Sequence, residues 1–156
     1  MMTENKSRQK ILIPPPVLYL CAFADGILLN YFFPVDIIPL YWKCIMGSVL
    51  IGCGCVLGYY TSREFHKHRI SVRHGKPPEW LITTGPFRFT RNPLYMVMNL
   101  LLTGIGFASG NIWTIAMVVP TILVMNWLVI RIEEKYLEDR FGNMYKEYKK
   151  KVRRWM

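Results

Sequence analysis

Four long apolar stretches constrain the fold of this chain more than any other feature. They occupy residues 16–33, 40–60, 94–109 and 111–130 of a sequence of 156 residues. A helix needs about 20 mostly apolar residues to cross a bilayer, so each stretch is long enough, or nearly so, to span it. Charged residues make up 19% of the chain, against about 25% in soluble domains. We therefore predict an all-α integral membrane bundle with about four transmembrane helices.

The positive charges alternate between the connections of these stretches. Of the 20 Lys and Arg residues, all but Lys43 lie before the first stretch, between the second and third, or after the fourth. By the positive-inside rule, this alternation predicts a multi-pass protein with both termini and the loop 61–92 in the cytoplasm. The host membrane stays open between the bacterial inner membrane and the endoplasmic reticulum. Basic blocks beside the membrane also predict membrane lipids as partners, and not nucleic acid.

Local turn chemistry predicts how the C-terminal half is arranged. Residues 109–111, Ser-Gly-Asn, form a tight polar turn, so the last two apolar helices should be an antiparallel hairpin that brings Tyr95 close to Glu133. Pro120 should kink the last of them. The tail from residue 132 mixes aromatic and charged residues, which predicts a C-terminal interfacial helix broken near Phe141 and Gly142.

Two groups of polar residues lie at the mouths of the predicted helices. One is the segment Gly85-Pro86-Phe87-Arg88-Phe89-Thr90-Arg91-Asn92-Pro93-Leu94-Tyr95, and the other is Arg131-Ile132-Glu133-Glu134. Ionisable residues at or near membrane depth are costly and are usually kept for binding or chemistry. The plain alternative is that they mark helix ends, with the arginines following the positive-inside rule. In the second group, i,i+3 spacing lets Arg131 pair with Glu134.

These two groups carry a resemblance to a known superfamily. Together with residues 81–84 and the later run Phe141-Gly142-Asn143-Met144-Tyr145-Lys146-Glu147-Tyr148, they resemble the isoprenylcysteine carboxyl methyltransferase and phospholipid methyltransferase superfamily of integral membrane enzymes. The resemblance implies a single membrane domain over 1–156, with the catalytic half at about 77–156. It also implies S-adenosyl-L-methionine as the methyl donor and a membrane-embedded or lipid-linked acceptor, such as the carboxylate of a prenylcysteine.

The resemblance also implies roles for individual residues. The cofactor would be bound by Leu81, Ile82, Phe87, Asn92, Pro93, Leu94, Tyr95 and Glu133. Arg88 and Arg91 would bind the acceptor, and Arg131 and Glu134 would be catalytic. The superfamily often has His where this chain has Asn92, and an amide cannot act as a base at neutral pH. This difference favours an acceptor that need not lose a proton, such as a carboxylate.

Two other functions remain open at this point. One is a nicotinamide-dependent membrane reductase of the sterol type, whose C-terminal pattern is similar but whose chains are normally longer. The other is a four-helix membrane protein without catalysis. We predict no metal site, because His66, His68 and His74 lie among Lys and Arg without a suitable Cys or carboxylate partner. A phospholipid amine and a small hydrophobic metabolite also remain open as acceptors.

Overall fold

The protein is all-α wherever its structure is described, in residues 14–68 and 80–155 of a computed structural model. The helices confirm the predicted fold class. They are α1 (Pro15–Phe32), α2 (Leu40–Lys67), the short 3₁₀ turn η1 (Gly85–Arg88), α3 (Pro93–Ser109), α4 (Ile112–Ala116), α5 (Val118–Met125), the π-helical turn η2 (Asn126–Ile130), α6 (Arg131–Phe141) and α7 (Asn143–Lys151).

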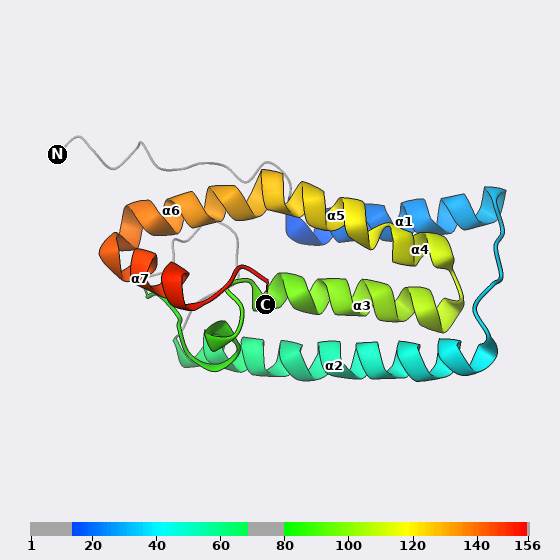
Figure 1. The fold of residues 1–156 in the computed structure, drawn as a ribbon, viewed down its shortest axis with the longest axis horizontal. Coiled ribbons are helices and arrows are strands. Elements are labelled where there is room, and N and C mark those ends of the chain that lie inside the picture. The colour runs from blue at the N-terminus through cyan, green and yellow to red at the C-terminus, as the bar shows by residue number, and fades with distance from the viewer. Residues whose placement is uncertain (1–13, 69–79, 156) are drawn as a thin grey trace.

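The chain runs back and forth along one axis (Figure 1). The helix α3 lies along α2, while α4, α5, η2 and α6 follow one another as a single long rod that passes beside α1. Three of these units, α1, α2 and the rod Ile112–Phe141, are long and apolar enough to cross a membrane, and α3 is a shorter apolar helix. The chain is therefore a helical membrane protein. The C-terminal segment returns to the beginning of α3 (Figure 1).

Two helices extend beyond their predicted ends. The helix α2 continues through 61–67, so this part of the predicted 61–92 loop is helical, and 69–79 lies outside the described residues. At about 1.5 Å per residue, α2 is about 42 Å long, against a hydrocarbon core of about 30 Å, so polar residues can continue the helix outside the lipid. The side chains of Glu64 and Lys67 pair within this extension at 2.6 Å. The fourth apolar stretch likewise continues to Phe141.

The rod is interrupted close to Pro120. Met117 separates α4 from α5. Pro120 has no N–H to donate to the carbonyl of Ala116 four residues earlier, and this accounts for the break one residue after Ala116. Further along, the helix breaks at Gly142, which has φ +53° and separates α6 from α7, as predicted.

Small residues let the helices approach closely. A Cβ atom on Gly26 of α1 would lie 2.5 Å from Thr114 Oγ1 and 2.7 Å from Thr114 Cα. Likewise, a Cβ atom on Gly47 of α2 would lie 2.9 Å from the Cβ of Ala108 in α3. Close approaches of this kind are typical of helix packing in membranes. Lipid gives no hydrophobic driving force between helices, so association depends on van der Waals packing, and small residues allow the backbones to come close.

The predicted turn between the last two apolar helices is present. Gly110 ends α3 in the left-handed conformation with φ +69°. The side chain of Asn111 accepts a hydrogen bond from the backbone N–H of Thr114 and so caps α4. The hairpin brings the beginning of α3 and the α6 part of the rod to the same end of the molecule (Figure 1).

Candidate functional site

A tyrosine and a glutamate from the two predicted polar groups meet at this end. Tyr95, in the first turn of α3, is 7% exposed. Its hydroxyl donates a hydrogen bond of 2.7 Å to Oε1 of Glu133 in α6. Because 38 residues separate the two in sequence, the contact depends on the hairpin, and the predicted closeness of these side chains is confirmed.

Helix α1 also contributes a hydrogen bond next to this pair, through Tyr19. The hydroxyl of Tyr19 lies 2.9 Å from Oδ1 of Asn99 and 3.3 Å from the carbonyl oxygen of Tyr95. Its one proton can be donated to either oxygen. Tyr19 is 8% exposed and belongs to the main buried cluster together with Tyr95. The position of Tyr95 is thus fixed by groups on α1, α3 and α6.

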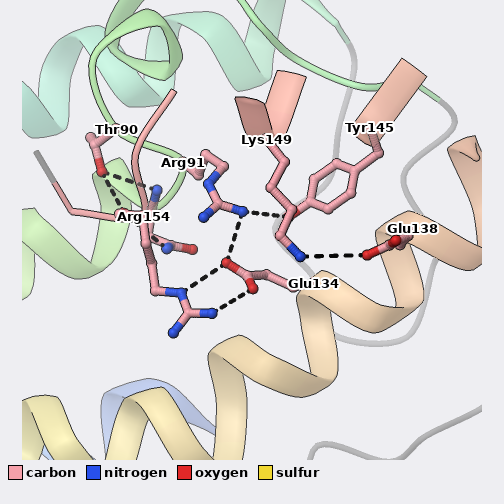
Figure 2. Close-up of polar contacts among 8 residues, drawn as sticks. Thr90, Arg91, Glu134, Glu138, Tyr145, Lys149 and Arg154 are labelled. Atoms are coloured by element: carbon pink, nitrogen blue, oxygen red, sulfur yellow. Dashed lines mark hydrogen bonds and ion pairs between the residues drawn. The ribbon is translucent and has the colours of Figure 1, made fainter. Parts of the chain in front are cut away.

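The neighbouring carboxylate, Glu134, lies between two arginines (Figure 2). Arg154 donates from Nε at 2.9 Å and from Nη2 at 2.6 Å, one bond to each carboxylate oxygen. Nη1 of Arg91 lies 3.0 Å from Oε1 of Glu134. The side chains of Glu134 and Arg91 are each 9% exposed. Bidentate arginine–carboxylate pairs of this kind combine strength with fixed geometry.

Hydrogen bonds also connect the C-terminal segment, residues 153–154, with residues 90–92 of the first polar group. The backbone N–H of Arg91 donates to the carbonyl of Arg153 at 3.1 Å. The carbonyl of Arg154 accepts from Thr90 Oγ1 at 2.9 Å and from Asn92 Nδ2 at 3.1 Å. The hydrogen bonds to Glu134 raise the pKa of Arg154 above its usual value. Residues 90–92, Glu134 and residues 153–154 therefore form one connected network.

Several residues with a predicted cofactor role lie beside α7. Leu81 packs against the buried cluster formed by Tyr145, Tyr148 and Val152, and Ile82 is 6% exposed. The carbonyl of Phe87 accepts a hydrogen bond of 2.7 Å from the Tyr148 hydroxyl. Burial raises the pKa of the Tyr145 and Tyr148 hydroxyls, so both are protonated at neutral pH and can donate. The segment 81–87 is therefore held between α7 and α2, since the Thr84 hydroxyl also donates a hydrogen bond of 2.7 Å to Glu64 of α2 and the ring of Phe87 contacts that of Phe65.

The other predicted cofactor residues surround the beginning of α3. Asn92 precedes the helix, and Pro93 is its first residue, where the missing proline N–H costs nothing. Leu94 is half-buried, and Tyr95 points to Glu133. The side-chain amide of Asn92 donates to the carbonyl of Arg154 in the C-terminal segment.

The three arginines with predicted site roles lie in three different environments. Arg91 is buried in the Glu134 network, whereas Arg88 is exposed. The guanidinium of Arg131 stacks on the ring of Trp127, with 3.6 Å from Cζ to the ring centroid. Ion pairs in the described parts of the chain do not include the expected one between Arg131 and Glu134, because Arg91 and Arg154 hold that carboxylate instead.

A polar hollow of about 340 Å³ adjoins the Glu134 network, between α6 and α7. Two of the predicted residues, Arg131 and Glu134, line it. The full lining is Arg131, Glu134, Lys135, Glu138, Asp139, Lys146 and Lys149. Glu138 lies 3.5 Å from Lys149 and 3.9 Å from Lys146. The hollow has room for a charged part of a small molecule, with both cations and carboxylates within reach.

Two buried polar atoms, one on Arg91 and one in the turn before Arg131, have no hydrogen-bond partner among the described residues. They are Nε of Arg91 and Oδ1 of Asn126, the first residue of the π-helical turn. A buried polar atom without a partner is costly, and π-helical turns occur often at functional sites. Both atoms are therefore candidates to bind a ligand, the first as a donor and the second as an acceptor.

Fold and site together define a helical membrane protein with a polar, partly buried cluster at one end of its bundle. The family model for phospholipid methyltransferases matches residues 42–144, about two thirds of the chain. The chain belongs to this family, and thus to the superfamily of membrane methyltransferases that the sequence resembles. An uncharacterized protein of Haemophilus influenzae is 41% identical over 63 residues, which are 40% of this chain and all of that protein. No solved structure matches.

Sequence reasoning missed part of the site. Tyr19 lies in an apolar stretch, where a tyrosine gives no sign of its role. Arg154 and Tyr145 belong to a basic tail that predicts contact with lipid headgroups, not with a buried carboxylate. Tyr19, Tyr145 and Arg154 all lie outside the matched region 42–144. A signal was present in the run around Tyr145, which carries part of the superfamily resemblance.

Proposed function

We propose that this protein transfers a methyl group from S-adenosyl-L-methionine to a lipid or lipid-linked acceptor in the membrane. Family membership supports methyl transfer by a membrane enzyme. The observation that carries the finer proposal is the 2.7 Å hydrogen bond between Tyr95 and Glu133. It joins the two polar groups of the superfamily pattern where a carboxylate and an aromatic ring can face one ligand.

The polar atoms at this end of the bundle suit the chemical groups of the methyl donor, S-adenosyl-L-methionine. Oε1 of Glu133 accepts from Tyr95, and its other carboxylate oxygen has no hydrogen-bond partner in the described parts of the chain. That oxygen and Oδ1 of Asn126 are acceptors that suit an ammonium group or ribose hydroxyls. Aromatic faces suit a sulfonium, and arginine or lysine beside the hollow suits a carboxylate. We assign cofactor binding to Leu81, Ile82, Phe87, Asn92, Pro93, Leu94, Tyr95 and Glu133.

The chemistry that the bound cofactor supplies is an electrophilic methyl group on sulfur, transferred by in-line displacement. The protein then has mainly to align the two reactants and to exclude water, and alignment alone can lower a barrier by about 7–11 kcal/mol. The network of Arg91, Glu134 and Arg154 holds residues 90–92 beside the beginning of α3. We assign Glu134 a positioning role on this ground, and Arg131 a binding role at the hollow.

The acceptor should be one that needs no protein base. Asn92 stands where many relatives have His, and its Nδ2 is committed to the carbonyl of Arg154. An amide cannot take up the proton that an ammonium acceptor must lose. A carboxylate attached to a hydrophobic chain meets this condition, since it is already a nucleophile at neutral pH.

Methyl transfer can be tested directly with purified protein and radiolabelled S-adenosyl-L-methionine. A total lipid extract and a prenylcysteine analogue serve as acceptors in parallel. Base-labile label indicates an ester, and base-stable lipid label indicates N-methylation. We expect base-labile label, and its loss in Glu133→Gln but not in Glu147→Gln, which changes an exposed glutamate outside the polar hollow.

A ligand-protection experiment separates this proposal from the reductase alternative. Ligands that bind the folded state raise its apparent stability. We expect S-adenosylhomocysteine to protect the detergent-solubilised protein against thermal unfolding, and NADPH to have no effect. Protection by NADPH alone would refute the proposal, and protection by neither ligand would favour a role without catalysis.

We further propose that the whole chain acts as one domain. Tyr19 of α1 and Arg154 of the C-terminal segment both contact residues of the family motif. With the orientation that the positive charges predict, the end carrying Arg91 and Glu133 would face the cytoplasm. S-adenosyl-L-methionine is a polar solute and would reach the site from that side.

A further inference from the structure

A second, apolar groove of about 790 Å³ lies along the outer side of α2. One end is covered by the segment that contains η1. Its lining consists of Ser48, Val49, Gly52, Cys53, Val56, Leu57, Tyr60, Gly85, Pro86, Arg88 and Phe89. Apart from Arg88, these residues carry no charge, so the groove suits a hydrocarbon chain.

The groove lies on the side of α2 that faces away from α3. Gly54 and Gly58 lie against Leu101 and Val97 of α3. At 100° per residue, Gly52 and Val56 lie on roughly the opposite side of the helix. The helix α2 thus separates the groove from α3, whose first turn carries Tyr95. A ligand in the groove would therefore be separated from Tyr95 by α2.

The size of the groove matches one leaflet of a bilayer. From Ser48 to Tyr60 the helix rises about 18 Å, and half of the hydrocarbon core is about 15 Å. Gly52 opens the middle of the groove, since a Cβ atom added there would have nothing within 4 Å. One extended acyl chain can therefore lie along this side of α2 without displacing a side chain.

Two arginines stand at the polar end of the groove. Arg88 lines it directly, and Arg63 lies one turn of α2 beyond Tyr60 on the same side. Both are exposed, and ion pairs in the described parts of the chain include neither. Guanidinium groups match phosphate in geometry and charge. A headgroup phosphate at this depth would therefore meet both cations.

We propose that the α2 groove binds one acyl chain of an anionic phospholipid, with the headgroup phosphate held by Arg63 and Arg88. This is a second lipid site, and it takes Arg88, which the superfamily resemblance had assigned to the methyl acceptor, for the headgroup phosphate instead. A zwitterionic lipid is a poorer occupant, because its own cation offsets the phosphate charge. Near a membrane surface each basic residue contributes about a fivefold preference for anionic lipid.

Photo-crosslinking in nanodiscs tests this proposal. The full chain is reconstituted in phosphatidylcholine and phosphatidylglycerol, with trace amounts of either lipid carrying a diazirine on its acyl chain. Labelled peptides are then mapped by mass spectrometry. We expect the phosphatidylglycerol probe to label residues 48–60 at least fivefold more than the phosphatidylcholine probe.

Variants of the groove identify its parts. The double variant Arg63→Gln/Arg88→Gln should lose most of this preference, whereas Arg140→Gln, an exposed arginine on α6, should keep it. Gly52→Leu fills the groove and should reduce labelling by both probes, while protection by S-adenosylhomocysteine, measured on the same sample, reports that the protein is folded. Equal labelling by the two probes, or unchanged preference in the double variant, would overturn the proposal.

Protection by S-adenosylhomocysteine is a readout separate from lipid labelling. Its absence in the unmodified protein would therefore speak against the methyltransferase proposal and not against the lipid site.

Discussion

Adjacent carboxylates in α6 should respond in opposite ways to the same substitution. We predict that Glu134→Gln destabilises the protein strongly, whereas Glu133→Gln leaves it folded and removes cofactor binding. The reason lies in their partners. Glu134 is held by two guanidinium groups through contacts of 2.6–3.0 Å, whereas Glu133 receives one hydrogen bond from a neutral hydroxyl.

The expected magnitude follows from burial. Breaking a buried ion pair by removing one partner costs about 3–5 kcal/mol, because the other charge remains uncompensated. In Glu134→Gln that charge is Arg91, whose side chain is 9% exposed and whose other side-chain hydrogen bond, among the described residues, is the one to the Tyr145 hydroxyl at 3.5 Å. Arg154 is 32% exposed and can turn to water. We therefore expect a loss of about 3 kcal/mol, at the lower end of this range.

For Glu133→Gln the cost should be small. The amide oxygen of glutamine can still accept the hydrogen bond from Tyr95, so we expect a loss below about 1 kcal/mol. The lost negative charge should instead appear as lost protection by S-adenosylhomocysteine. The two variants thus separate stability from binding.

The assay is reversible denaturation in mixed detergent micelles, followed by circular dichroism and repeated with S-adenosylhomocysteine. Glu138→Gln is the matched control, because its partners Lys146 and Lys149 are 57% and 42% exposed and such surface pairs contribute about 0–1 kcal/mol. If Glu134→Gln were as stable as this control, or less destabilised than Glu133→Gln, our reading of the network would be wrong.

Two further variants test the packing and the site. Tyr95→Phe removes the donor to Glu133 and should cost about 1.5 kcal/mol together with most of the radiolabel transfer; a fully active variant would contradict the proposed role. Gly26→Ala places a methyl group against the backbone of Thr114 and should cost at least about 1 kcal/mol by overpacking, whereas Gly52→Ala, which meets open space, should be neutral or slightly stabilising in the same denaturation experiment. Equal stability of the two glycine variants would show that α1 and α4 do not pack as closely as described.

Hydrophobic pattern and turn chemistry were enough to predict the bundle. The apolar stretches fixed the helices because lipid leaves few alternatives for a backbone. The turn at Gly110 then predicted that Tyr95 and Glu133 would meet. Both inferences use short-range signals, which a single sequence contains.

Short-range signals could not predict which way the side chains of the second polar group, residues 131–134, point. The i,i+3 spacing allowed Arg131 to pair with Glu134, but Arg131 stacks on Trp127 instead. The π-helical turn Asn126–Ile130 precedes this group and changes the phase of the helix. Neither that turn nor the return of Arg154 from the end of the chain leaves a mark in the spacing of residues. The roles of the predicted site residues remain predictions for the variants above.

The contact of Tyr19 with Tyr95 and Asn99 has a consequence for engineering this enzyme class. Tyr19 precedes the region 42–144 that the phospholipid methyltransferase family shares. A fragment cut to the family's common core would leave the oxygen atoms of Tyr95 and Asn99 without this donor at the centre of the bundle. Chimaeras built from related chains should therefore exchange α1 and α3 as a matched pair.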